Sequence, residues 1–215
     1  MRAIECAKIF MQEKLDTPRD TYAGNMKLQK LLYFAQLISL AKYNTPLFPE
    51  KIYAFEHGMV IDDIRREYKN NYQTILNDND RTFSNQEQDV LDLTIKIFGG
   101  YNADELSEIT HHHLSWKLEY EDGTLPNGYH NKEESEVSLD SLRENEVQDM
   151  KDLIHSSEKS SESKKPFKEI YFDGSVFRFD PDNVSVENIK EFVNKNHFPP
   201  DDYVAFRKNK EVFVY

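Results

Sequence analysis

The chain has 215 residues, of which 39 are acidic and 27 are basic, so its formal net charge is −12. This sign is wrong for a protein whose main task is to grip phosphates through a basic surface, and 13% aromatic residues is too many for a disordered polyelectrolyte. No apolar run approaches the roughly 20 residues that cross a bilayer, and the first ten residues are unlike a signal peptide, so we expect a cytoplasmic protein.

Apolar residues recur at helical spacing in the first part of the chain. The spacing predicts helices over 2–14, 25–43 and 60–68, whereas residues 52–55 form a short apolar piece that is either a strand or an extended segment. The only cysteine, Cys6, has apolar neighbours at helical spacing and is expected to be buried. Along 25–43 the apolar stripe leaves three polar side chains largely on other faces of the helix, namely Lys27, Lys30 and Gln36.

Capping signals predict the later helices of this part. Ser84 and Glu87 have the spacing of a capping box, and the helix that they open is expected to end at the glycine pair 99–100 in a left-handed C-cap. Another short helix is expected to begin near residue 102, and a last one at Ser138. The first 155 residues therefore read as a helical domain with little sheet.

Composition and period change after residue 155. Residues 156–165 contain no apolar side chain for burial and read as a flexible linker. Beyond them an Asp-Gly turn at 173–174 joins two alternating runs, an amphipathic helix follows, and a second hairpin ends the chain. The sequence thus predicts a mainly α protein with a small α+β unit, of order β-β-α-β-β, over 166–215.

Two histidine sites are candidates for a chemical role, as metal ligands or as a general base. The run His111-His112-His113 has poor geometry for a metal, because consecutive helical positions point about 100° apart. We expect one of these rings to pack against Trp116 and the others to be solvated at a helix end, and we expect no metal and no cofactor. His57, between Glu56 and Gly58, is either a general base or, more simply, part of a turn in which the glycine supplies a positive φ angle.

The remaining charged residues leave two readings open. Asp62 and Asp63 lie three and four residues from arginines and are expected to pair with them along a helix. No nucleophile motif or phosphate-binding glycine loop is present, so an enzyme is the weaker hypothesis. A small nucleic-acid surface is the other alternative, and its candidate residues are Lys27, Lys30, Arg65, Arg66 and Lys69.

Five motifs follow one another within the first 155 residues. They are K-L-Q-K-L-L-Y-F-A-Q at 27–36, P-L-F at 46–48, H-G-M-V at 57–60, R-E-Y-K at 66–69, and L-S-E-I-T-H at 106–111 with Trp116 after it. Together they resemble the Panacea, or SocA-like, antitoxin domain, a family that includes phage-associated GepA-type proteins. Where this family usually has proline the chain has Met59 and Ser115, and both departures concern the geometry of local turns.

The resemblance implies an antitoxin that neutralises a protein toxin, encoded nearby, by direct binding and without catalysis. An alternative within the same family is a proteolytic adaptor that delivers its bound toxin to a ClpXP-type protease. A role as an enzyme or as a nucleic-acid-binding regulator is less favoured, and no membrane partner is expected. The motif positions, with either structural or partner-binding roles, are Lys27, Gln29, Lys30, Tyr33, His57, Gly58, Tyr68, His111 and Trp116.

The unit over 166–215 lies outside the resemblance, so we assign it a hypothetical role in recognising the toxin. Aromatic side chains are favoured interface anchors, although about half of them would instead form the small core of this unit. The candidates are Tyr171, Phe177, Phe179, Tyr203, Phe206, Phe213 and Tyr215.

Overall fold

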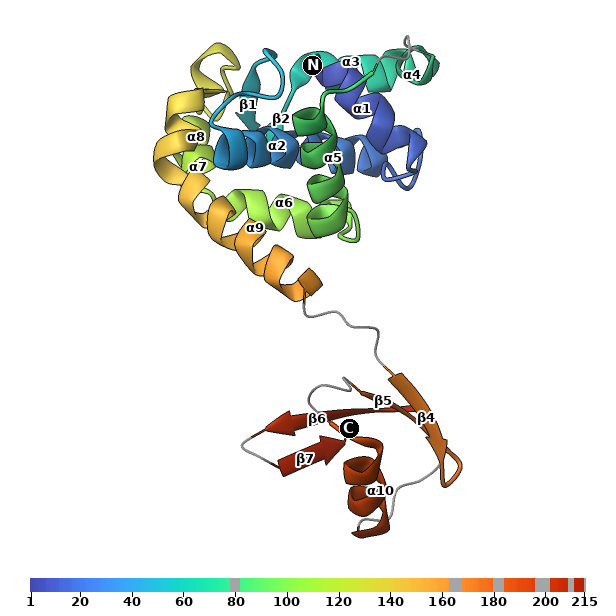
Figure 1. Cartoon of the computed structure of the whole chain (residues 1–215). Coiled ribbons are helices and arrows are strands. Elements are labelled where there is room, and N and C mark those ends of the chain that lie inside the picture. Colours follow the sequence, from blue (N-terminus) through green and yellow to red (C-terminus); the bar gives the residue numbers. More distant parts are fainter. Residues whose placement is uncertain (78–81, 163–167, 180–183, 196–201, 209–210, 215) are drawn as a thin grey trace. The chain divides into compact units, whose positions relative to one another are not determined.

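The structure is a computed structural model that describes residues 1–77, 82–162, 168–179, 184–195, 202–208 and 211–214. The chain divides into two compact units, Met1–Ser156 and Ser157–Tyr215 (Figure 1). Across the described residues, no helix combines the length and the hydropathy needed to span a bilayer.

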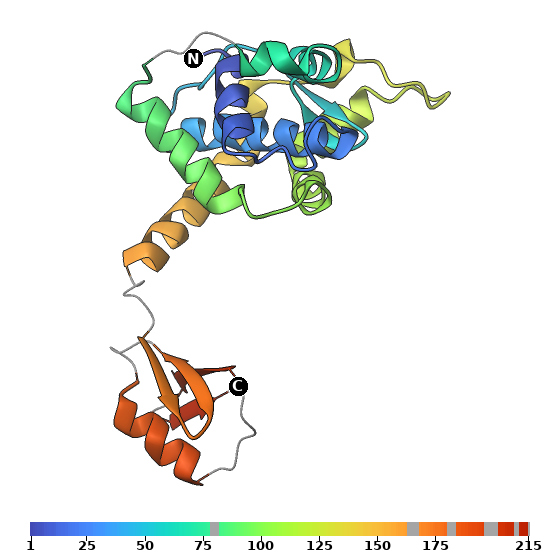
Figure 2. The same cartoon turned by 90° about the vertical axis from the view of Figure 1, so that its right-hand side faces the viewer.

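Helix α2 (Tyr22–Tyr43) is the centre of the first unit. Figures 1 and 2 show it passing through the middle, with α1 (Ala3–Gln12), α5 (Asn85–Phe98) and α6 (Ala103–His112) packed around it. Every residue from 27 to 41 is buried, so this helix is covered on all sides. Lys27, Lys30 and Gln36, which were expected largely on other faces of the helix than its apolar stripe, are buried too, because neighbouring elements also cover those faces.

Local signals fix the ends of these helices. Ser84 and Glu87 form the predicted capping box of α5, with the Glu87 amide donating to Ser84 Oγ over 3.2 Å. The predicted left-handed C-cap is wrong, because Gly99 has φ −60° and ψ −30°. Its amide continues the helical pattern by donating to Ile95 O over 2.9 Å, and its carbonyl accepts from the side chain of Lys27, so the helix end is satisfied without a left-handed residue.

A three-stranded antiparallel sheet lies against α2, with the order β2-β1-β3. The predicted strand or extended segment is β1 (Ile52–Phe55), which pairs with β2 (Gly58–Val60) and with β3 (Glu136–Val137). The expected helix over 60–68 begins later, as α3 (Asp62–Asn70), because Val60 pairs with Tyr53 in the sheet.

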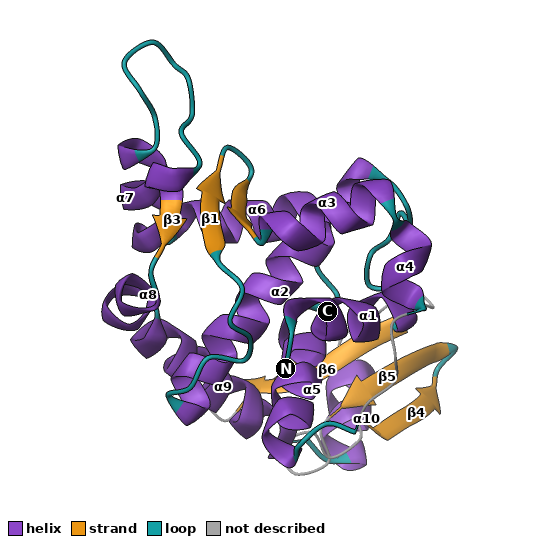
Figure 3. Ribbon diagram, turned by 90° about the horizontal axis from the view of Figure 1, so that it is seen from above, coloured by secondary structure: helices purple, strands orange, loops and turns teal. Residues whose placement is uncertain are grey.

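The last helices of the first unit differ from the sequence prediction. The single helix expected from Ser138 is two, α8 (Leu139–Asn145) and α9 (Val147–Glu162), which break at Glu146. Helix α9 also includes residues 156–162, so most of the predicted flexible linker is helical. Two short helices were not predicted, α4 (Tyr72–Leu76) and α7 (Leu114–Asp122). Figure 3 shows the loop from Gly123 onward extending beyond α7 before the chain returns to β3.

The second unit confirms the predicted order β-β-α-β-β. Its four strands align as β4-β5-β6-β7, with β5 and β6 parallel and the outer pairs antiparallel. Asp173 and Gly174, at φ 50° and 78°, form the predicted turn of the first hairpin. The elements are β4 (Lys168–Phe172), β5 (Ser175–Phe179), α10 (Val186–Lys195), β6 (Asp202–Lys208) and β7 (Glu211–Val214). The fold is mainly α with a small α+β part, as the sequence predicts.

Candidate functional site

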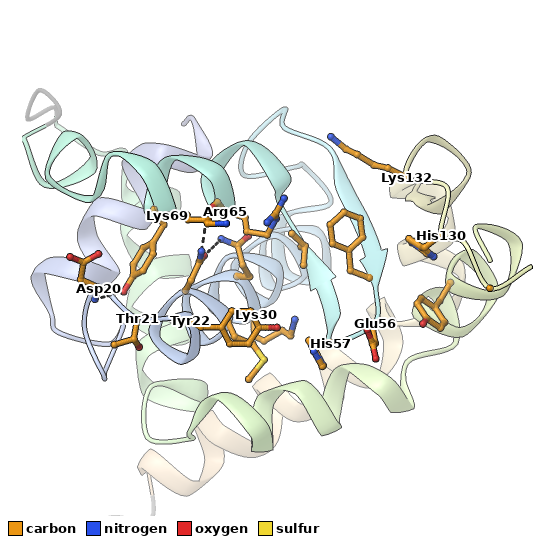
Figure 4. A pocket seen from close by; sticks show the side chains of 18 residues that line it. Asp20, Thr21, Tyr22, Lys30, Glu56, His57, Arg65, Lys69, His130 and Lys132 are labelled. Carbon is orange, nitrogen blue, oxygen red and sulfur yellow. Dashed lines mark hydrogen bonds between the residues drawn. The ribbon is translucent and has the colours of Figure 1, made fainter. Parts of the chain in front are cut away.

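The first unit contains an open pocket with a volume of about 770 Å³. Its walls come from the start of α2, the β1–β2 hairpin, α3, and the end of α7 with the loop that follows it. Figure 4 shows Lys30 and His57 on one side of it, Arg65 and Lys69 from α3 on another, and Lys132 from the loop at its far end. We call it the cation pocket, since four lysine and arginine side chains and only two carboxylates, Asp20 and Glu56, line it.

Lys30 is the most unusual member of the cation pocket. It is 0% exposed, and its Nζ donates to the backbone carbonyl of Met59 over 3.0 Å. No carboxylate in the described part of the chain forms an ion pair with it. Burial lowers the pKa of Lys30 to about 7, because taking an ammonium group out of water disfavours its charged form.

Two other cations of the pocket, Arg65 and Lys132, share one carboxylate with Arg66, which does not line the pocket. Asp62, at the start of α3, is 1% exposed and lies 2.6 Å from Arg65, 2.7 Å from Arg66 and 2.7 Å from Lys132. The predicted pairing along this helix is confirmed for Asp62, whereas Asp63 forms no ion pair among the described residues. Burial alone would raise the pKa of Asp62, but hydrogen bonds from Lys132 and Arg65 lower it. One buried negative charge thus faces three positive ones, and exposed Lys69 has no ion-pair partner among the described residues.

Aromatic rings form another wall. Tyr120 stacks between Trp116, at a centroid distance of 4.9 Å, and His130, at 5.1 Å. His111 packs against the far face of Trp116 at 4.2 Å, as predicted for one of the three histidines. The edge of Phe55 completes the column at 5.7 Å from His130. Tyr120, His130 and Phe55 line the pocket itself, and across it an exposed Tyr22 meets His57 edge-on.

The turn between β1 and β2 is held by side chains that donate to its backbone carbonyls. His111 Nε2 lies 3.0 Å from Glu56 O, Trp116 Nε1 donates to Phe55 O over 2.9 Å, and Ser107 Oγ donates to His57 O over 2.7 Å. Gly58 has φ +93°, which confirms the predicted positive φ angle, and a Cβ there would collide with Thr110 Oγ1. These contacts give His111 and Trp116 a structural function, and burial lowers the pKa of His111.

The polar residues of the motif at 27–36, on α2, likewise bind backbone groups of other segments. Lys27 Nζ donates to Gly99 O over 3.0 Å, and Gln29 accepts from the amide of Ile61 over 2.9 Å. At the end of the signature, Gln36 binds both the amide of Leu47 and the carbonyl of Phe48. The polar positions of the motif therefore satisfy backbone groups of neighbouring segments that have no ladder partner.

A second polar cluster lies one turn further along α2. The hydroxyl of Tyr33 shares a 2.5 Å hydrogen bond with His113 Nδ1, which lies 3.6 Å from Glu146 Oε2. Glu146 Oε1 accepts from the amide and from the hydroxyl of Ser115, at 2.9 and 3.1 Å. We call these four residues the Glu146 network. Burial raises the pKa of Tyr33 and lowers that of His113, and Glu146 opposes the second shift.

The Glu146 network corrects one prediction and explains a departure from the family pattern. The prediction that two of the three histidines are solvated is correct only for His112, because His113 is largely buried and contacts Tyr33 and Glu146. Ser115 uses its backbone N–H, which a proline would lack. Sequence reasoning misses Glu146, which is buried, because nothing in its local sequence distinguishes it from the exposed glutamates of the chain.

Of the other predicted residues, Tyr68 also lines the cation pocket, and the rest lie apart from both clusters. Tyr68 is buried and donates to Asp16 Oδ2 over 2.9 Å, and Cys6 is buried with its pKa raised by desolvation. In the second unit Phe177 and Phe179 belong to the core, so their side chains do not face solvent, whereas Tyr171 is 77% exposed. The side chains of Tyr203, Phe206 and Phe213 are outside what the structure describes, as is the whole of Tyr215.

The first unit thus combines a helical scaffold, a hairpin that side chains fix in place, and an open pocket beside that hairpin. The family model described as antitoxin SocA-like, Panacea domain, matches residues 28–117, from the first turns of α2 into α7. The resemblance is thus confirmed over this segment, and the match supports an antitoxin role in general terms. No curated protein and no solved structure matches the chain. Tyr120, His130 and Lys132 of the cation pocket lie beyond the matched segment.

Proposed function

We propose that this protein is the antitoxin of a toxin–antitoxin system and that it neutralises a cognate protein toxin by binding it directly. The family match over residues 28–117 carries this proposal. The packing of the motif residues agrees with it, because their side chains build a rigid scaffold on which a recognition surface is presented. We further propose that neutralisation needs no catalysis, and the contact of His111 Nε2 with Glu56 O, which helps to hold the hairpin turn, supports a structural role for this histidine.

The test begins with the reading frame beside the gene. Its product is expressed alone and together with this protein, and growth is measured. We expect arrest in the first case, rescue in the second, and a stable complex of the two proteins on copurification. Rescue without a complex, combined with a shortened lifetime of the toxin in cells that contain a ClpXP-type protease, would instead support the adaptor function.

Two variants locate the activity within the chain. A deletion of 157–215 tests whether the second unit recognises the toxin, with circular dichroism as the check that the first unit stays folded. If the folded deletion variant still protects cells, the second unit does not recognise the toxin. A triple substitution of Glu56, His57 and His111 tests the proposed absence of catalysis, because a folded variant that still binds the toxin but no longer protects would indicate an enzyme.

A further inference from the structure

We propose that the cation pocket binds a nucleotide, meaning a small molecule that carries both an aromatic base and one or more phosphates. This proposal is independent of the antitoxin function and concerns a different kind of partner. It rests on a local surplus of positive charge, on a wall of aromatic rings and on the size of the pocket.

The charge surplus indicates an anion. Lys30 is buried and bound to a carbonyl oxygen, and Lys69 has no ion-pair partner among the described residues. Arg65 and Lys132 must share Asp62 with Arg66. A buried cation without a counter-charge is costly, and a bound phosphate beside it would remove that cost. This local balance is the reverse of that of the whole chain, in which acidic residues outnumber basic ones by 39 to 27.

The start of α2 adds to the positive potential. Thr21, its N-cap, and Tyr22, its first residue, both line the cation pocket. A helix N-terminus carries a partial positive charge, and α2 is 22 residues long. The helix end therefore acts together with Lys30 and Lys69 on the same open volume.

The ring wall indicates that the anion carries a flat aromatic group. Tyr120 and His130 lie nearly parallel, at 27°, with Trp116 behind Tyr120 and Phe55 against His130, so both faces of Tyr120 are already covered and this stack forms a fixed aromatic wall. Tyr22, which is 70% exposed and lines another side of the pocket, offers the ring on which a base can stack. Phe55 is already engaged by Arg65, 5.9 Å from its ring centroid, which places a cation beside the rings.

The shape favours a small molecule over an acidic segment of a partner protein. A volume of about 770 Å³ lies within the range of small-molecule sites, roughly 300–1,000 Å³. The walls come from four separate segments of one unit and enclose the volume from several sides (Figure 4). A peptide partner would more commonly require an extended groove or a sheet edge.

The full chain is titrated with ATP, GTP, adenosine and inorganic pyrophosphate by calorimetry. Trp116, the only tryptophan, stacks on Tyr120 at the pocket wall and gives a fluorescence signal for the same site. We expect at least one nucleotide to bind about tenfold more tightly than both adenosine and pyrophosphate. Equal binding of pyrophosphate, binding of a polyglutamate peptide in place of nucleotides, or no binding at all would each overturn the proposal.

Surface variants place the ligand without disturbing the fold. Lys69→Ala is expected to weaken nucleotide and pyrophosphate binding, by about fivefold, whereas Tyr22→Ala weakens only nucleotide binding. The matched controls are Lys151→Ala on α9 and Tyr101→Ala before α6, both exposed and outside the pocket. If the pocket variants bind as the controls do, the ligand lies elsewhere and the proposal is wrong.

Discussion

Two buried polar regions lie one turn apart on α2, and they differ in the polar partners of their buried charged group. In the Glu146 network, the buried carboxylate accepts from Ser115 and lies beside His113, which in turn shares a hydrogen bond with Tyr33. At the cation pocket, Lys30 is also buried, but its Nζ donates only to a backbone carbonyl oxygen, that of Met59. A closed network of this kind stabilises a fold, whereas an uncompensated charge beside an open volume is typical of a site that awaits a partner.

The largest loss of stability is expected in the Glu146 network. Glu146→Ala removes the acceptor for the amide and hydroxyl of Ser115 and should lower the free energy of unfolding by about 3 kcal/mol. Glu146→Gln is the control, because it keeps an oxygen in the same place and should cost about 1 kcal/mol. Urea denaturation measures both. Equal losses in the two variants would mean that the network is not what stabilises this region.

The turn that closes the pocket should be the next most sensitive position. Gly58→Ala forces a side chain into φ +93° and against Thr110 Oγ1 and Lys30 Cε, so we expect a loss of about 2 kcal/mol. Gly128→Ala is the matched control, because Gly128 has φ +80° but no atom near its missing Cβ. The difference between the two thermal midpoints isolates the effect of close packing, and no difference would contradict it.

A smaller loss tests the first hydrogen bond of the Glu146 network. Tyr33→Phe removes the hydroxyl that pairs with His113 Nδ1 and should cost about 1 kcal/mol in chemical denaturation. Tyr129→Phe, at an exposed tyrosine, should leave the stability unchanged. A Tyr33→Phe variant as stable as the wild type would show that His113 finds another partner.

A substitution at Lys30 in the cation pocket should increase the stability of the fold and not lower it. Lys30→Met keeps the volume and removes a desolvated charge, so at pH 7 we expect a gain in stability of about 1 kcal/mol. In the unfolded chain lysine keeps its proton to about pH 10, whereas folded Lys30 loses it near pH 7. Between these values the unfolded state binds more protons, so the stability of the wild type rises with pH and the advantage of methionine shrinks.

This last prediction is measured as the difference between wild type and Lys30→Met across pH 6 to 10, in which contributions from other titrating groups largely cancel. Lys30→Arg is not a suitable control, because it keeps a larger cation in the same space. A difference that does not change with pH would show that Lys30 remains charged throughout and is compensated in a way that the pocket geometry does not reveal.

The sequence predicts well those features that depend on residues close together in the chain. The capping box at Ser84 and Glu87 and the Asp-Gly turn at 173–174 each depend on residues a few positions apart, and both are present. The helical stripe of α2 was also visible, but not the burial of Lys30, because periodicity does not show when a helix is covered on every side.

The sites depend on residues that are distant in the chain. Lys132 reaches Asp62 across 70 positions, and Glu146 reaches Ser115 across 31. No motif or spacing rule links such pairs, and the match to the family model ends at residue 117, before Tyr120 and His130. For the same reason Val60 was assigned to a helix, since its pairing with Tyr53 comes from the sheet and not from its neighbours.

The hairpin turn over 55–58 has a further consequence for variation. Its acceptors are backbone carbonyls, and its donors come from distant helices, so the identity of the side chains at Glu56 and His57 is not part of what holds the loop. Both side chains are exposed at the rim of the pocket. Mutational drift at these two positions can therefore alter what the rim recognises while the scaffold beneath it remains the same, which separates the evolution of specificity from that of the fold.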